Sequence, residues 1–195
     1  MPRSTTLTAA ALTALAACAF AAPAASQVTT AGGEVVSTAQ KHLIDNLITI
    51  DSIQAATAKL AAMKTENPSV KEFANTLASD HAAHAGGLQK VADKKDVGRE
   101  ADAGNTLPTE FAARYTALES TPAGPEFDRA FLKAVVANHQ AEIAAINTGK
   151  ASAHDDDLKK DLSQTLNGLQ SHLAKANELS ATLDKSMTAP AKPPR

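Results

Sequence analysis

The chain has 195 residues, of which 44% are hydrophobic and 3% aromatic, and its formal net charge at pH 7 is −2. It contains no tryptophan and no basic tract, so it lacks the phosphate-facing surface and the stacking platforms that nucleic-acid binding requires. Its length suits one domain with a substantial core.

Residues 1–26 are predicted to be an export signal peptide. Arg3 gives a short basic start, an apolar run rich in alanine and leucine covers residues 7–20, and residues 22–26 supply small side chains for cleavage. The apolar run is too short and too rich in alanine for a membrane span. We therefore expect a periplasmic protein whose mature chain has no transmembrane span, and we exclude the leader from the fold.

Cys18 lies inside this leader and permits a second interpretation. Leu15-Ala16-Ala17-Cys18 fits the lipobox of bacterial lipoproteins, in which a lipid on Cys18 would anchor the mature chain to the outer membrane. The apolar run continues past Cys18 to a good cleavage site, which favours the ordinary signal peptide. Cleavage there removes the only cysteine, which excludes disulfides, thiolate metal sites and cysteine catalysis.

The rest of the chain is predicted to be all-α, because good helix formers dominate and glycine and proline gather in short clusters. Long helices are expected over about 34–64, 68–93, 125–148 and from 155 onward, with a short helix near 110–118. We place the domain at residues 27–186. The proline-rich residues 187–195 are assigned to a disordered tail.

The apolar stripe of each long helix alternates steps of four and three residues, as in a helical bundle. The stripe of the first helix contains Gln54, and that of the second contains His81 and His84. The third and fourth helices carry His139 and His172 at equivalent positions. Each long helix therefore brings at least one polar side chain into the predicted core.

Local signals predict where these helices begin and end. Asn67 is a good N-cap and Pro68 a good first residue for the second helix, and Gly149 is expected just after the end of the third. Gly86 and Gly87, inside the second helix, each cost about 1 kcal/mol relative to alanine. This pair is compatible with a close backbone approach, a kink or an early end of the helix.

The connection lengths predict the topology. Short turns join the first two long helices and the last two, so each pair forms an antiparallel hairpin, whereas a connection over residues 94–124 separates the hairpins. Two hairpins joined by a long crossover that contains a short helix make a ferritin-like four-helix bundle.

In this topology Gln54, His81, His139 and His172 are expected in one layer at the middle of the bundle. Positions at similar distances from a hairpin turn lie at similar heights, and Gln54 and His81 differ by roughly 5 Å, one helical turn. If a metal ion binds at this layer, Gln54 is expected beside the metal ligands and not among them.

Three further side chains are expected near this layer. Glu142 follows His139 at i+3 and His84 follows His81 at the same spacing, so the members of each pair share a helix face. Asp80 points away from the stripe and is expected to orient an imidazole from outside the ligand set.

The layer supports two interpretations. In the first, His81, His139 and His172, assisted by Glu142 or His84, bind a divalent transition metal, because imidazole and carboxylate ligands suit Zn, Cu, Ni or Fe. In the second, the same imidazoles form a metal-free hydrogen-bond layer in a structural or stress-related envelope protein.

Several familiar activities are poorly supported. The di-iron site of ferritin-like proteins uses a glutamate from every helix, whereas this chain has Gln54 in place of a carboxylate on the first. Neither a nucleophile motif nor a phosphate-binding loop is present in the sequence. Enzymatic activity is therefore undecided, with a non-catalytic role favoured, and the sequence indicates no substrate or protein partner.

Three of the predicted helices each carry short motifs, and these motifs occur in the same order and at a similar spacing in a known protein family. They are Val70-Lys71-Glu72-Phe73-Ala74, Asp80-His81, Glu126-Phe127-Asp128, Phe131-Leu132, Asn138-His139, Leu169, Ser171-His172-Leu173 and Ala176. With these motifs the chain, over residues 37–184, resembles the bacterial envelope family called domain of unknown function 4142, whose members are often described as predicted outer membrane proteins.

That resemblance implies a ferritin-like bundle in the cell envelope, and it implies no established activity. His81, His139 and His172 match the motif histidines of the family. The family often carries a glutamate where this chain has Gln54, so the resemblance also implies that any metal site here is weakened or altered.

Overall fold

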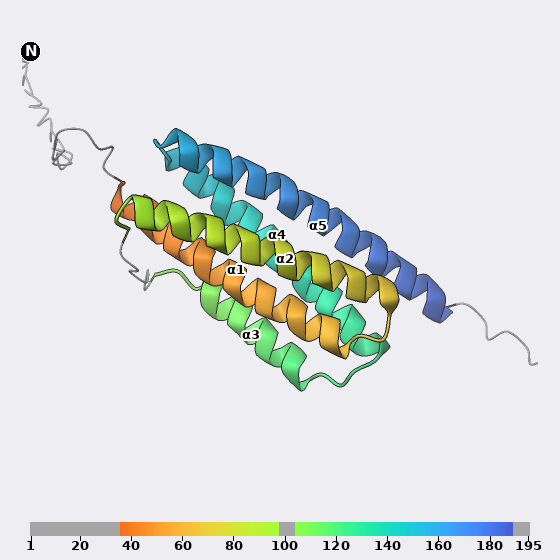
Figure 1. Cartoon of the computed structure of the whole chain (residues 1–195). Helices are drawn as coiled ribbons and strands as arrows, with labels where there is room; N and C mark the ends of the chain where they lie inside the picture. The colour runs from red at the N-terminus through yellow and green to blue at the C-terminus, as the bar shows by residue number, and fades with distance from the viewer. Residues whose placement is uncertain (1–35, 98–103, 189–195) are drawn as a thin grey trace, which may run out of the picture. The chain divides into compact units, whose positions relative to one another are not determined.

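The structure is a computed structural model that describes residues 36–97 and 104–188, and these residues form five helices and no strand (Figure 1). The helices are α1 (Thr38–Lys64), α2 (Pro68–Lys94), α3 (Leu107–Ser120), α4 (Pro125–Ser152) and α5 (Asp156–Thr188). All five belong to the unit Glu34–Arg195. The all-α prediction is confirmed. None of the helices in the described ranges is long and apolar enough to cross a membrane.

The helices pack chiefly as two pairs. Short connections over residues 65–67 and 153–155 join α1 to α2 and α4 to α5, and the members of each pair lie side by side (Figure 1). Helix α3 packs against α1 and α4, and further contacts link α1 to α4 and α2 to α5. Helix α3, which lies between α2 and α4 in the chain, therefore runs beside α1.

Two separate apolar clusters form the core of this unit. The first includes Phe73, Leu77, Phe127, Phe131, Leu132 and Leu179. The second includes Ile44, Leu47, Leu88, Ile146, Leu158 and Leu162. Each cluster draws on α1, α2, α4 and α5, and the first also includes Leu118 of α3. The polar side chains described below lie at the level between the two clusters.

Most helix limits agree with the sequence, because local capping sets them. The side chain of Asn67 accepts hydrogen bonds from the backbone N–H groups of Ser69 and Val70, and Pro68 opens α2 as predicted. Ser37 and Gln40 form a capping box at the start of α1, which is later than the predicted residue 34.

The prediction that Gly149 follows the end of its helix is wrong, because α4 continues to Ser152. Gly149 lies inside the last turns of α4, where a Cβ atom would collide with the side chain of Leu43. The missing side chain therefore serves a close approach between α1 and α4, and it does not terminate a helix.

Some sequence-based predictions fall outside the described residues. The signal peptide over residues 1–26, with Cys18, is one of them, and most of the tail over residues 187–195 is another. Helix α5 includes residues 187 and 188, which the sequence assigns to that tail.

Helix α2 runs without a break through Gly86 and Gly87, where an added Cβ atom would meet no described atom within 4 Å. We therefore expect Gly86→Ala or Gly87→Ala to raise the free energy of unfolding by about 0.5–1 kcal/mol, since alanine favours the helix and restricts the unfolded chain. Urea unfolding at a constant m value measures this change. Gly149→Ala is the control, because its methyl group must displace Leu43; equal effects at all three positions would contradict the prediction.

Candidate metal centre

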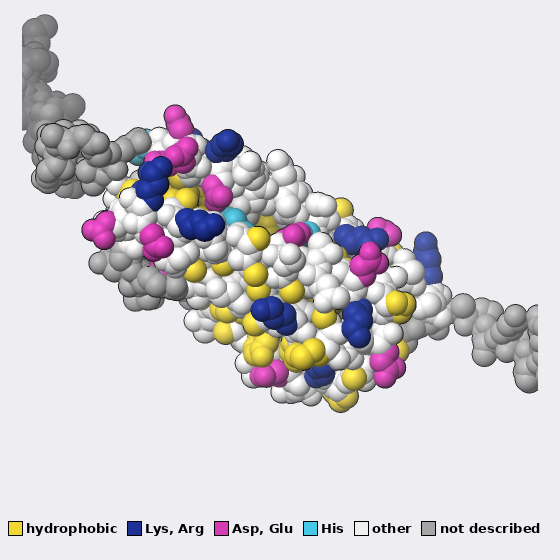
Figure 2. All heavy atoms as spheres, viewed as in Figure 1, with side chains coloured by type: hydrophobic (Ala, Val, Ile, Leu, Met, Phe, Trp, Pro, Cys, Tyr) yellow, Lys and Arg dark blue, Asp and Glu magenta, His cyan; other side chains and the backbone are white. Residues whose placement is uncertain are grey.

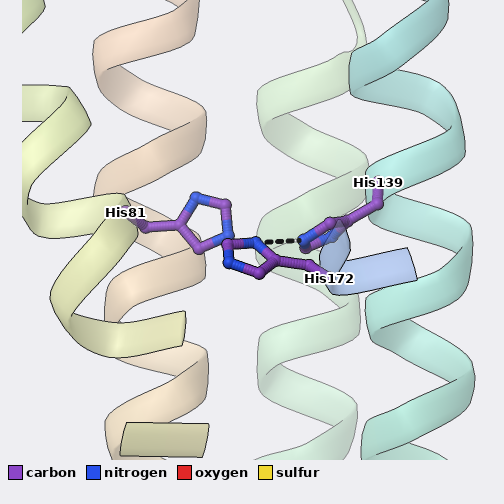
Figure 3. Close-up of side chains that lie close together, drawn as sticks. All are labelled: His81, His139 and His172. Atoms are coloured by element: carbon purple, nitrogen blue, oxygen red, sulfur yellow. Dashed lines mark hydrogen bonds between the residues drawn. The ribbon is translucent and has the colours of Figure 1, made fainter. Parts of the chain in front are cut away.

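Three buried imidazoles converge from three helices. His81 of α2, His139 of α4 and His172 of α5 are 3%, 1% and 9% exposed, and their rings face one another (Figure 3). Nε2 of His139 lies 3.3 Å from Nδ1 of His172. One ring nitrogen from each histidine lies within 4.8 Å of those from the other two, which is close enough for all three to bind one metal ion.

The helix pattern explains why these rings meet. Each histidine occupies the apolar stripe of its helix, so its side chain points toward the neighbouring helices instead of solvent. The short connection between α4 and α5 places His139 and His172 at matching heights, and the contact between α2 and α5 brings His81 beside them. The ring centroids are 5.2 to 5.7 Å apart.

Carboxylates hold two of these rings from the outside. Nδ1 of His81 lies 2.8 Å from Oδ1 of Asp51, and Nε2 of His172 lies 2.9 Å from Oδ2 of Asp80. An ionised carboxylate only accepts, so the facing nitrogen of each ring carries a proton. In the neutral form of each ring the inward nitrogen, Nε2 of His81 or Nδ1 of His172, then bears the lone pair. Nε2 of His81 has no hydrogen-bond partner within the described part of the chain.

A second group of polar side chains adjoins the outer nitrogen of His81. Nε2 of Gln54 donates a 2.5 Å hydrogen bond to Oε2 of Glu142 and lies 3.5 Å from Nδ1 of His81. Asp51 and Glu142 are both fully buried. Asp51, His81 and Glu142 also offer ligand atoms within 4.8 Å of one another.

His84 lies apart from the three converging imidazoles and pairs with carboxylates. Its Nδ1 lies 2.6 Å from Oδ2 of Asp51, and its Nε2 lies 2.6 Å from Oγ1 of Thr165 and 3.4 Å from Oδ2 of Asp161. Burial opposes protonation of His84, but Asp161 and Asp51 outweigh it and raise the pKa of His84 to about 10. His84 is therefore a cation at neutral pH.

Two of the converging imidazoles, His139 and His172, are held in the neutral form that binds metals. Burial lowers the pKa of His139 well below its usual value, and the nearby His81 and His172 lower it further. Burial also lowers the pKa of His172, although the hydrogen bond to Asp80 opposes this change. A neutral imidazole has a lone pair that can bind a metal, so metal binding does not have to displace a proton from that nitrogen.

The two buried carboxyl groups differ in ionisation. Burial opposes the ionisation of Asp51, but the hydrogen bonds from His81 and His84 outweigh it and lower the pKa of Asp51. Burial and the charge of Asp51 raise the pKa of Glu142 to about 8, despite the hydrogen bond from Gln54. The group thus contains one carboxylate and one carboxyl group that retains its proton at neutral pH.

Comparison with known protein families relates the chain to one family. The model of the family described as Domain of unknown function (DUF4142) matches residues 24–179, which is most of the chain. The chain belongs to this family. No curated protein and no solved structure matches it.

The structure of this DUF4142 domain brings most of the predicted site residues together. His81, His139 and His172 form the converging group, and Asp80 contacts His172. Glu142 does not join that group and lies instead on the Asp51 side of His81.

Asp51 is the main site residue that sequence reasoning missed, and the statement that Gln54 replaces any carboxylate on the first helix is wrong. Asp51 lies three residues before Gln54 and four after Leu47, so it satisfies the same helical spacing. Ile50 satisfies that spacing as well, and an aliphatic side chain is the usual occupant of a buried position. The fully buried carboxylate of Asp51 therefore belongs, with Gln54 and Glu142, to the second group of polar side chains in this DUF4142 domain.

Proposed function

We propose that the domain binds one divalent transition metal ion through Nε2 of His81, Nε2 of His139 and Nδ1 of His172. The observation that carries this proposal is the convergence of three buried ring nitrogens within 4.8 Å while carboxylates hold the outer nitrogens of two of the rings. A carboxylate on the far nitrogen fixes the tautomer and orientation of a metal-binding histidine and raises its basicity.

The donor set indicates the class of metal. Three neutral imidazoles suit Zn, Cu, Ni or Fe, and sites with three protein ligands keep a further position for water or another ligand. The Asp51 and Glu142 carboxyl groups on the other side of His81 leave Fe among the candidates, since iron also accepts oxygen ligands.

Titration of metal-free protein with Zn²⁺, Cu²⁺ and Ni²⁺ tests the proposal. We expect one ion per chain, and we expect Asp80→Asn to weaken the affinity about 10- to 100-fold, because the amide holds the far nitrogen of His172 less well. Asp93→Asn is the matched control, since Asp93 is an exposed carboxylate on the same helix. Absence of uptake by the wild-type protein would refute the proposal.

The alternative function is a metal-free layer in a structural envelope protein. It is supported by the contact between His139 and His172, which can form a hydrogen bond without any ion. In that case all three metals leave the stability of the domain unchanged, and His81→Leu yields a folded protein of equal or higher stability.

We further propose that α1, α2, α4 and α5 form a ferritin-like four-helix bundle in which the segment containing α3 is the crossover between two hairpins. The short connections within each helix pair and the contacts of α3 with α1 and α4 support this arrangement. An experimental structure in which these four helices pack in a different spatial arrangement would exclude it.

Export to the periplasm is proposed from the leader over residues 1–26. Mass spectrometry of the protein recovered from cells distinguishes the two possible forms. A mature chain that starts near residue 27 supports a soluble periplasmic protein, whereas a chain that starts at a lipid-modified Cys18 supports the outer-membrane lipoprotein.

A further inference from the structure

A solvent-connected cavity of about 230 Å³ lies where α2 and α5 adjoin. Helix α2 contributes Asp80 and His84 to its wall, and α5 contributes Asp161 and Gly168. Figure 2 shows histidine atoms at the surface beside acidic side chains along this line between the two helices. The cavity therefore gives solvent a path toward the interior of the helical unit.

The inner wall of this cavity includes His81 and His172. These are two of the three proposed metal ligands, so a metal ion bound to them would have one side turned toward the cavity. Three imidazoles satisfy only three of the four positions that zinc and similar ions use. A further ligand could therefore reach such an ion from the cavity.

The size of the cavity limits what can enter it. Its volume is below the range of about 300–1,000 Å³ that is usual for drug-sized ligands. The side chains of Asp80 and Asp161 near the opening are 53% and 28% exposed. His84 pairs with both Asp51 and Asp161, and the charge of a bound divalent ion would offset the negative charge that remains, so charge alone does not exclude an anion.

Hydrogen-bonding groups line this cavity. Gln164 offers an amide and Asp161 a carboxylate, whereas the hydroxyl of Thr165 is already bonded to His84 and to the backbone oxygen of Asp161. Such a wall can position a small polar molecule through both donors and acceptors.

From this geometry we propose that the cavity admits a small molecule with a nitrogen or oxygen donor atom, which binds the metal at its open position in exchange for water. This inference rests on the proposed metal centre. It adds an exchangeable ligand site, which a purely structural metal would lack.

The Co²⁺ form of the full chain provides the test, because the visible spectrum of Co²⁺ responds to the number and type of its ligands. Imidazole, used in mildly alkaline solution where it is neutral, and azide are the two probes. We expect both to change the spectrum. Gly168→Phe should raise the half-saturating imidazole concentration about tenfold or more, because the ring fills the cavity.

A Cβ atom at Gly168 meets no described atom within 4 Å, so the phenylalanine can be accommodated while α5 stays folded. Gln170→Phe is the control, since this exposed position on α5 adds the same ring outside the cavity. Both variants should still take up one Co²⁺ ion. If Co²⁺ does not bind to the wild-type chain, the metal centre itself is refuted.

Two further results would overturn the exchangeable site alone. One is that Co²⁺ binds normally but its spectrum responds to neither probe, which indicates a closed coordination sphere. The other is an equal imidazole response in Gly168→Phe and the wild-type chain, which indicates that the ligand does not enter through this cavity.

Discussion

Replacing Asp51 with alanine is expected to lower the free energy of unfolding of the metal-free protein by about 3–5 kcal/mol, the usual loss when one partner of a buried ion pair is removed. Asp51 is fully buried and contacts Nδ1 of both His81 and His84. Its removal leaves a largely buried imidazolium without its nearest carboxylate and a second ring without its acceptor. Urea unfolding monitored by circular dichroism measures the change in midpoint.

Two further variants make this result interpretable. Asp51→Asn keeps the volume and one acceptor atom but not the charge, so its loss should be smaller than that of Asp51→Ala, and it remains measurable if the alanine variant does not fold. Glu66→Ala removes an exposed carboxylate just after α1 and should change stability by no more than about 0.5 kcal/mol. An alanine variant at position 51 that is as stable as the wild type would show that the carboxylate does not support the layer.

Zinc is expected to raise the melting temperature of the metal-free wild-type protein and to leave that of His139→Ala unchanged. A ligand at 100 times its dissociation constant stabilises the folded state by about 2.7 kcal/mol. For a domain of this size, each kcal/mol shifts the melting temperature by about 2–4 °C, so a rise of roughly 5–11 °C is expected. Differential scanning calorimetry with and without excess zinc provides the measurement.

His154→Ala is the matched control for this experiment, because His154 is exposed and lies in the connection before α5, away from the three rings. It should retain the full zinc effect. A zinc-dependent rise that persists in His139→Ala but disappears in His154→Ala would place the binding site at the surface and contradict the buried centre.

Much of the helical layout was predictable because it depends on local chemistry. The N-cap of Asn67 and the position of Pro68 fix the start of α2, and the sequence alone shows both. Gly149 misled the prediction of the end of α4 because its function is tertiary: it leaves space for Leu43 of α1, a contact between residues far apart in the chain. No local pattern distinguishes such a glycine from one that ends a helix.

The site was partly predictable for a similar reason. His81 and Gln54 break otherwise apolar stripes, so their burial could be read from spacing. Asp51 could not be chosen over Ile50, because a helical stripe accepts a residue either three or four positions along, and only the neighbouring histidines make a carboxylate favourable there. The cavity between α2 and α5 depends on the separation of two helices, which the spacing of residues within each helix does not determine.

The division of the apolar core into two clusters has a consequence for how the molecule opens. Each cluster draws on α1, α2, α4 and α5, so each end of the helical unit is packed as a small core of its own. The helix backbones and the polar contacts between the clusters connect these two ends. An ion bound to α2, α4 and α5 at that level would make the ends unfold as one cooperative unit, and loss of the ion would let amide protons at one end exchange independently of those at the other.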